Sequence, residues 1–125
     1  MSANTVKKIL IIEDDEDLHI LYRLYLQGES YEIFQARNGR EGLEQAEKEK
    51  PDIIILDMIM PVLDGEEFIR KFRFEKKLFD IPIIIASVND KIPRDLIEKG
   101  KIQKVLRKPF PIEVLLQEIA AVLKS

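Results

Sequence analysis

The stretch that most constrains this chain is residues 53–65, Ile-Ile-Ile-Leu-Asp-Met-Ile-Met-Pro-Val-Leu-Asp-Gly. Its start is continuously apolar and rich in β-branched residues, which is typical of a strand buried on both faces of a parallel sheet. The run leads directly into one carboxylate, Asp57, and is broken by Pro61 and Gly65. In open α/β sheets, ligand sites lie at the carboxyl ends of the strands. Polar residues also begin ordinary loops, so the other charged positions have to decide the role of Asp57.

The composition describes one globular domain. The 125 residues match the commonest domain size, and 46% hydrophobic residues with 34% charged residues is too apolar for a disordered chain. The net charge of −3 does not favour a nucleic-acid surface, and the absence of cysteine excludes disulfides and thiol chemistry. No run resembles a signal peptide or reaches membrane-spanning length. A cytoplasmic protein without membrane contact is therefore expected.

Strand and helix patterns alternate five times along the chain. Strands are expected at residues 9–12, 31–36, 53–56, 81–86 and, weakly, 105–106. The helices between and after them are expected to end at Gly28, to end near Pro51, to begin at Gly65, and to cover 93–100 and 111–124. This alternation predicts an α/β fold with a doubly wound five-stranded parallel sheet and right-handed crossovers.

Helical spacing predicts which residues face the core. Asp14 or Asp15 is expected to cap the first helix. His19, the only histidine of the chain, is expected at the surface of this helix. The residues expected on inner faces are Leu18, Leu21, Tyr22, Tyr25 and Leu26 on the first helix, Leu43 and Ala46 on the second, Phe68, Ile69 and Phe72 on the third, and Leu115, Ile119, Val122 and Leu123 on the last.

Residues able to do chemistry follow the strands. The first strand ends in five acids from Glu13 to Asp17, the third in Asp57, the fourth in Ser87, and the fifth shortly before Lys108. A helix cap explains one or two of the five acids, but not all of them. Because the carboxyl ends of parallel strands share one edge of the sheet, these side chains are expected to meet there.

The expected cluster combines carboxylates, an ammonium and a hydroxyl. Three carboxylates at one edge repel one another unless a hard cation such as Mg²⁺ joins them. With Lys108 and the hydroxyl of Ser87, the set suits phosphoryl transfer, in which positioning and charge neutralisation dominate. Asp57 is the expected nucleophile, which would form a mixed anhydride with phosphate. Glu13 and Asp14 are expected to hold the metal, and Lys108 to pair with the phosphoryl oxygens.

On these residues the chain resembles the receiver domain of two-component response regulators over residues 6–123. The resemblance implies a flavodoxin-like (βα)5 fold with strand order 2-1-3-4-5, a requirement for Mg²⁺, and phosphate received from a sensor histidine kinase or phosphotransfer protein. The matching segments are Ile-Leu-Ile-Ile-Glu-Asp-Asp at 9–15, Leu-Asp-Met-Ile-Met-Pro-Val-Leu-Asp-Gly at 56–65, Ile-Pro-Ile-Ile-Ile-Ala-Ser at 81–87 and Lys-Pro-Phe at 108–110.

The resemblance also assigns roles to single residues. It implies no enzyme activity beyond Mg²⁺-dependent self-phosphorylation and slow self-dephosphorylation, no direct nucleic-acid contact, and homodimers through the face of the fourth helix, fifth strand and fifth helix. The family's phosphoacceptor falls on Asp57, its acidic pair on Glu13 and Asp14, its metal-binding backbone carbonyl on Ile59, its switch hydroxyl on Ser87, and its lysine, usually before a cis proline, on Lys108 and Pro109.

The chain departs from the family on its fifth strand. The aromatic residue that often changes rotamer on activation is replaced by Val105 or Lys104, depending on the alignment. Val88 replaces a small residue after the switch hydroxyl. Residues 87–100 form a short, polar segment with few apolar anchors, so we expect phosphorylation to order this segment and to leave the Val105 rotamer unchanged.

Three other functions are compatible with parts of the sequence. A phosphatase of the haloacid dehalogenase type needs a second aspartate two residues after the nucleophile, where this chain has Ile59. A flavin binder would need a hydroxyl-rich phosphate loop after the first strand, and the acids there would repel phosphate. The remaining alternative is a receiver-like interaction module that acts without phosphorylation, which the unusual fifth strand favours and the complete set of site residues opposes.

Overall fold

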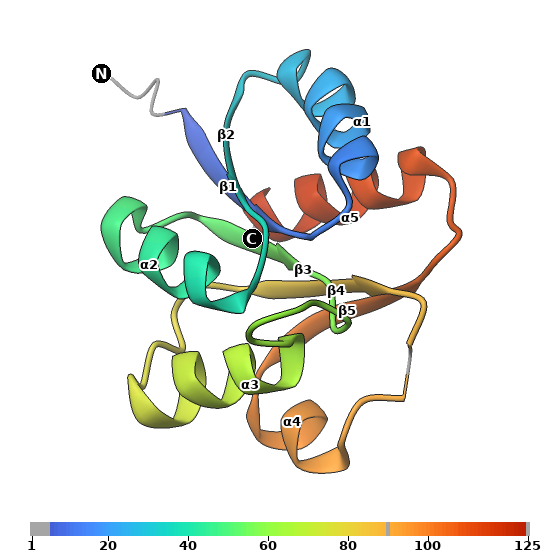
Figure 1. The fold of residues 1–125 in the computed structure, drawn as a ribbon. Coiled ribbons are helices and arrows are strands. Elements are labelled where there is room, and N and C mark those ends of the chain that lie inside the picture. Colours follow the sequence, from blue (N-terminus) through green and yellow to red (C-terminus); the bar gives the residue numbers. More distant parts are fainter. Residues whose placement is uncertain (1–5, 90, 125) are drawn as a thin grey trace.

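The computed structural model describes residues 6–89 and 91–124, and it confirms the predicted sheet. Five parallel strands lie in the order β2-β1-β3-β4-β5 (Figure 1). The strands are β1 (Lys7–Ile12), β2 (Tyr31–Ala36), β3 (Ile53–Leu56), β4 (Ile83–Ser87) and β5 (Ile102–Arg107). The helices are α1 (Glu16–Gln27), α2 (Gly39–Glu49), α3 (Gly65–Ile69), α4 (Arg94–Lys99) and α5 (Ile112–Lys124), and a π-helical segment (Arg70–Glu75) continues α3.

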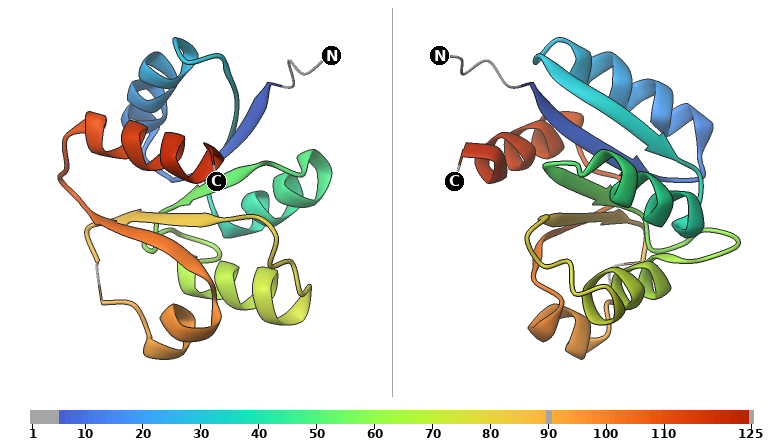
Figure 2. Two further views of the ribbon diagram at one scale, coloured as in Figure 1. Left: turned by 180° about the vertical axis from the view of Figure 1, so that it is seen from behind. Right: turned by 90° about the vertical axis from the view of Figure 1, so that its left-hand side faces the viewer.

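Helices cover both faces of the sheet. Helices α1 and α5 lie on one face, and α2, α3 and α4 lie on the other (Figure 2). The central strand β3 is fully buried, as its unbroken apolar run predicts. Alternate residues of the central strands therefore contribute to two separate hydrophobic layers, one with Tyr22 and Leu115 and the other with Phe68 and Leu96.

The inner face of α1 differs from the prediction. Tyr22 and Leu26 are buried as expected, but Leu21 and Tyr25 are 38% and 46% exposed. The expected surface residue His19 is completely buried. Residues 19, 22 and 26 share one face because they are spaced by three and four positions, so the histidine takes the inward place that the pattern had assigned to its apolar neighbours.

Strand β5 and helix α5 also differ from the prediction. Strand β5 has six residues rather than two, and Gln103 is an extra residue where the register with β4 shifts. Val105 packs against the layer of α2, α3 and α4, so it takes the inward place on this strand, while Lys104 is exposed. On α5, Leu115 and Ile119 are buried, but Val122 and Leu123 are only partly buried.

Helix α4 is short, as predicted, but it is better anchored than the sequence suggests. Leu96 is completely buried, and Arg70 holds Asp95 through two hydrogen bonds of 2.7 and 3.2 Å. At the other end of α4, the buried guanidinium of Arg73 donates to the carbonyl of Gly100 at 2.7 Å. Leu96 is the one buried side chain of α4, as the expectation of few apolar anchors implies, and the contacts that the sequence did not predict are the polar ones of Arg70 and Arg73. In the loop before α4, Asp90 lies outside the described residues.

Helix length bears on membrane insertion. Within residues 6–89 and 91–124, none of the helices combines the length and the apolar character that crossing a bilayer requires.

Candidate functional site

The strand ends bring the predicted residues to one edge of the sheet. The backbone N–H of Asp57 donates to the carbonyl of Ile12 at 3.0 Å, which joins the end of β3 to the end of β1. The N–H of Lys108 donates to the carbonyl of Ser87 at 2.9 Å, which joins the end of β5 to the end of β4. Four consecutive strands of the sheet thus place the predicted side chains side by side.

Three carboxylates form the centre of this edge. One oxygen each from Glu13, Asp14 and Asp57 lies within 4.8 Å of the others. Glu13 and Asp57 are 3% and 7% exposed, whereas Asp14 is exposed. An all-oxygen donor set of this kind fits a hard cation such as Mg²⁺. The shallow hollow above the carboxylates is lined by Glu13, Asp14, Asp15, Leu18, Asp57, Ile59, Val88 and Lys108.

Lys108 enters the carboxylate cluster from β5. Its ammonium donates to Oε1 of Glu13 at 2.6 Å and to Oδ2 of Asp57 at 3.2 Å. Burial lowers the pKa of Lys108, but the hydrogen bond to Glu13 and the charge of Asp57 outweigh burial, so the pKa lies above its usual value. The Lys108–Pro109 peptide bond is cis, as the resemblance implies. The lysine therefore stays charged and partly neutralises the acids.

Glu13 is the most constrained of the three acids. Its backbone N–H donates to the carbonyl of Ala36 at 3.0 Å, and its Oε2 accepts the N–H of Asp15 at 3.1 Å. Burial, with a smaller effect from the charge of Asp57, raises the pKa of Glu13 to about 7, although Lys108 opposes both. The ionised form of Glu13 is therefore destabilised by burial and by the charge of Asp57, and a bound cation would offset this destabilisation.

Ser87 and Ile59 lie beside the cluster. The hydroxyl of Ser87 is buried and accepts the backbone N–H of Asn89 at 3.2 Å, so its proton remains available for a ligand. The N–H of Ile59 donates to Oδ1 of Asp57 at 3.1 Å, and the Ile59 side chain is 51% exposed at the rim of the hollow.

The loop after Asp57 is held by Gly65. A Cβ atom at this position would lie 2.5 Å from Cα of Met58 and 2.6 Å from the carbonyl oxygen of Asp57, so only glycine allows the close approach. The next helix, α3, begins with a capping box, in which Asp64 accepts the N–H of Glu67 and Glu67 accepts the N–H of Asp64. The motif at residues 56–65 thus fixes the loop after Asp57 through its glycine and its helix cap.

Two residues near the site have roles that the sequence did not assign with certainty. Asp15, one of the two expected caps, accepts the N–H of Asp17 and therefore caps α1, which leaves Asp14 for the cluster. His19 was expected at the surface, but its Nε2 lies 2.6 Å from the backbone carbonyl of Glu13. The signal that identifies it is its spacing of three and seven residues from the buried Tyr22 and Leu26.

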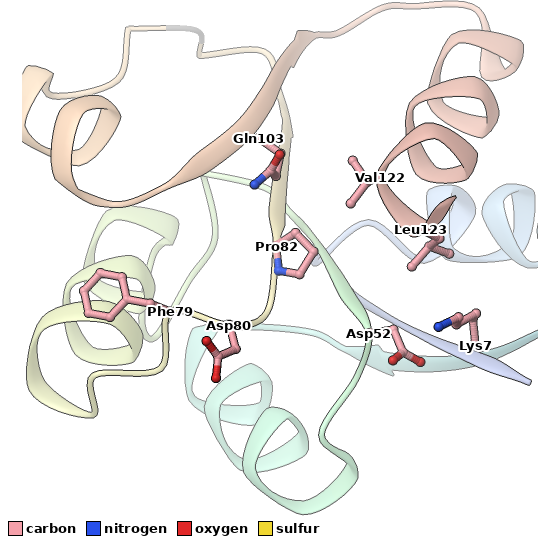
Figure 3. A pocket seen from close by; sticks show the side chains of 8 residues that line it. All are labelled: Lys7, Asp52, Phe79, Asp80, Pro82, Gln103, Val122 and Leu123. Carbon is pink, nitrogen blue, oxygen red and sulfur yellow. The ribbon is translucent and has the colours of Figure 1, made fainter. Parts of the chain in front are cut away.

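A second hollow lies at the opposite edge of the sheet (Figure 3). Asp52 is part of it, but its carboxylate already accepts the N–H of Lys8 at 2.8 Å, and Asp80 comes from the loop before β4. No group of three metal-binding side chains occurs there among the described residues. The carboxylate cluster is therefore the better candidate for chemistry. The residues that line the second hollow are Lys7, Asp52, Phe79, Asp80, Pro82, Gln103, Val122 and Leu123.

Comparison with known proteins finds one family and relatives that carry the corresponding names. The response regulator receiver domain family matches residues 9–120. The alkaline phosphatase synthesis transcriptional regulatory protein PhoP of Bacillus subtilis is 39% identical over 84 residues, which are 67% of this chain and 34% of that protein. Sporulation initiation phosphotransferase F of the same organism is 34% identical over 110 residues, 86% of each chain.

The chain matches only part of several longer regulators, and it matches a solved receiver structure over nearly its whole length. The chain spans between 34% and 51% of the length of five regulators that it matches, PhoP among them. The response regulator TrrA of Thermotoga maritima, solved in complex with Mg²⁺ and BeF, has a TM-score of 0.81 and 30% identity, covering 94% of this chain and 99% of that one.

Proposed function

Because this chain belongs to the response regulator receiver domain family of two-component systems, we propose that it is a phosphoacceptor switch in which Asp57 takes up the phosphoryl group. The observation that carries the proposal is the contact of Asp57 with Lys108, next to Glu13 and Asp14. Asp57 is a buried carboxylate at a hollow that opens to solvent, so an incoming phosphoryl group can reach its oxygen from one side.

The transfer itself needs little chemistry from the protein. A carboxylate oxygen of Asp57 attacks the phosphorus of a phosphohistidine, the P–N bond breaks, and the mixed anhydride forms. The imidazole leaves with the bond electrons and takes up a proton. Positioning and neutralisation of charge on the phosphoryl oxygens then decide the rate.

Each neighbouring residue has a task in this proposal. The carboxylates of Glu13, Asp14 and Asp57, with the backbone carbonyl of Ile59, would hold Mg²⁺, which would neutralise the negative charge of the phosphoryl group. The ammonium of Lys108 would move from Glu13 to a phosphoryl oxygen. The hydroxyl of Ser87, which donates to no other group among the described residues, would donate to another phosphoryl oxygen.

The proposal extends to the partners of the chain. Phosphate would come from a sensor histidine kinase or a phosphotransfer protein, and the change would be read by another protein or by a homodimer formed through α4, β5 and α5. The chain would work in the cytoplasm without direct contact with nucleic acid or membrane. It would not be an enzyme beyond its own phosphorylation and slow dephosphorylation.

One observation favours a phosphorylation-independent interaction module. The inward position on β5 is Val105, which is too short to change between buried and exposed states as an aromatic residue would. Intact mass after incubation with Mg²⁺ and acetyl phosphate separates the two functions. The phosphoacceptor proposal expects the addition of one phosphoryl group, and unchanged mass with and without Mg²⁺ favours the module.

A further inference from the structure

His19 is a buried histidine beside the carboxylate cluster, yet none of the roles described above uses it. Its side chain is completely inaccessible to solvent, and its Nε2 atom lies 2.6 Å from the backbone carbonyl oxygen of Glu13. A carbonyl oxygen can only accept a hydrogen bond, so Nε2 carries the proton and donates it. The ring thereby binds the backbone of a residue whose side chain belongs to the cluster.

The carbonyl that His19 holds is part of the peptide group between Glu13 and Asp14. Because a peptide group is planar, fixing the direction of its carbonyl also fixes the N–H of Asp14. The neighbouring N–H of Glu13 is held by the carbonyl of Ala36 at 3.0 Å. The backbone is therefore restrained on both sides of Glu13.

Asp14 depends on this restraint more than the other two acids do. The carboxylates of Glu13 and Asp57 are each held by Lys108. Among the described residues, Asp14 has no hydrogen bond or ion pair through its exposed carboxylate. The direction of its side chain toward the other two acids is thus set by its backbone.

The second ring nitrogen of His19 does not account for a histidine at this buried place. Among the described residues, Nδ1 of His19 is buried without a hydrogen-bond partner. A buried unpaired acceptor is unfavourable, and a leucine at this place would not carry one. The feature that leucine lacks is the Nε2–H donor to Glu13.

We propose that His19 is a positioning residue, which orients the peptide group between Glu13 and Asp14 so that both carboxylates face one cation. The inference rests on the proposed function of this acidic pair. His19 does not contact the cation itself and acts through the backbone. Residues that orient metal ligands in this way typically change metal affinity by about tenfold or more when they are replaced.

The test compares His19→Leu with His19→Gln. Amide NMR titration measures the dissociation constant for Mg²⁺, and urea unfolding without Mg²⁺ measures stability. His19→Leu should weaken Mg²⁺ binding about tenfold. His19→Gln keeps an N–H donor at a similar reach and should restore most of the affinity. In the metal-free protein, the backbone chemical shifts of Glu13 and Asp14 should move in His19→Leu and return toward wild type in His19→Gln.

Leu26→Val is the matched control, because Leu26 is a buried residue of the same helix at its far end. It should lower stability and leave Mg²⁺ affinity unchanged. If His19→Leu does not fold, His19→Asn replaces it, since its shorter amide does not reach Glu13. The proposal is overturned if His19→Leu, or His19→Asn in its place, binds Mg²⁺ as tightly as wild type. It is also overturned if His19→Gln loses as much Mg²⁺ affinity as that variant. If Asp14→Ala also leaves Mg²⁺ affinity unchanged, the proposed metal site itself fails.

Discussion

The ammonium of Lys108 lies 2.6 Å from Oε1 of Glu13, so in this structure a cation of the protein itself pairs with one of the three carboxylates. A metal ion that binds Glu13 has to compete with this ion pair. The same displacement would free the lysine for a phosphoryl oxygen. Lys108 and Mg²⁺ are therefore expected to oppose each other in the resting site and to act together once phosphate is present.

Lys108→Met should bind Mg²⁺ more tightly than wild type. Its expected gain is about tenfold, because a hydrogen bond between charged groups contributes about 1.5 kcal/mol. Lys104→Met is a suitable control, since Lys104 is an exposed lysine of the same strand that pairs with Glu118 at 3.9 Å. Calorimetric or NMR titration of Mg²⁺ measures the difference, and weaker binding in Lys108→Met would show that the lysine supports the metal instead.

Asp57→Asn should stabilise the metal-free protein. The variant removes a charge that helps to raise the pKa of Glu13, so at pH 7.5 the free energy of unfolding should increase by about 1 kcal/mol, the equivalent of roughly one pKa unit. Asp14→Asn should gain less, because Asp14 is exposed. Urea unfolding without Mg²⁺ measures both, and a loss of stability in Asp57→Asn would mean that its ion pair with Lys108 outweighs the repulsion.

Glu13 should make the metal-free protein less stable as the pH rises. Burial raises its pKa in the folded protein from 4.5 to about 7, so its contribution is fully present below pH 4.5 and is lost as the pH rises through about 7. As the pH rises from 4.5 to about 7, the free energy of unfolding of wild type should therefore fall relative to that of Glu13→Gln. A difference between the two proteins that does not change with pH would contradict the raised pKa.

His19 should have the opposite pH dependence. Burial lowers the pKa of its ring from 6.5, so the folded protein keeps it neutral while the unfolded chain takes up a proton below that value. Its contribution is present above pH 6.5 and is lost as the pH falls. Between pH 6.5 and 5, wild type should lose more stability than His19→Gln in parallel urea series, and equal slopes would rule out a buried neutral ring.

Phosphorylation should order the loop of residues 88–93. In the proposed mechanism the hydroxyl of Ser87 would turn from the N–H of Asn89 to the phosphoryl oxygen, whereas α4 is already held through Asp95 and Gly100. Amide exchange with and without Mg²⁺ and beryllofluoride should show increased protection in the described part of this loop, and the rotamer of Val105 should stay unchanged. Protection that rises only around Asp57 and Lys108 would contradict this route.

The sequence was sufficient for most of the fold because the central strands have unmistakable patterns. The unbroken run before Asp57 could only be buried on both faces, and its breakers at Pro61 and Gly65 set its end. The same strand ends then brought Glu13, Asp57 and Lys108 together, as their order along the chain predicts. Local pattern and sheet topology agree at each of these positions.

The remaining features depend on contacts that no local pattern contains. Leu21 and His19 exchange their expected places on α1, because the apolar pattern allows more than one inner face and only packing against the sheet selects the face of residues 19, 22 and 26. The anchoring of α4 depends on Arg70 and Arg73, which are 25 or more residues away from their partners in the sequence. A charged residue in a polar helix carries no signal for such a contact.

The phosphorylated residue can be identified directly by chemical reduction and mass spectrometry. The protein is incubated with Mg²⁺ and acetyl phosphate and reduced with borohydride, which converts an aspartyl phosphate to homoserine, and the modified position is located by peptide mass spectrometry. We expect homoserine at Asp57, only when Mg²⁺ is present, and none in Asp57→Asn. Homoserine at Asp14 or another residue, or modification that does not require Mg²⁺, would contradict this expectation.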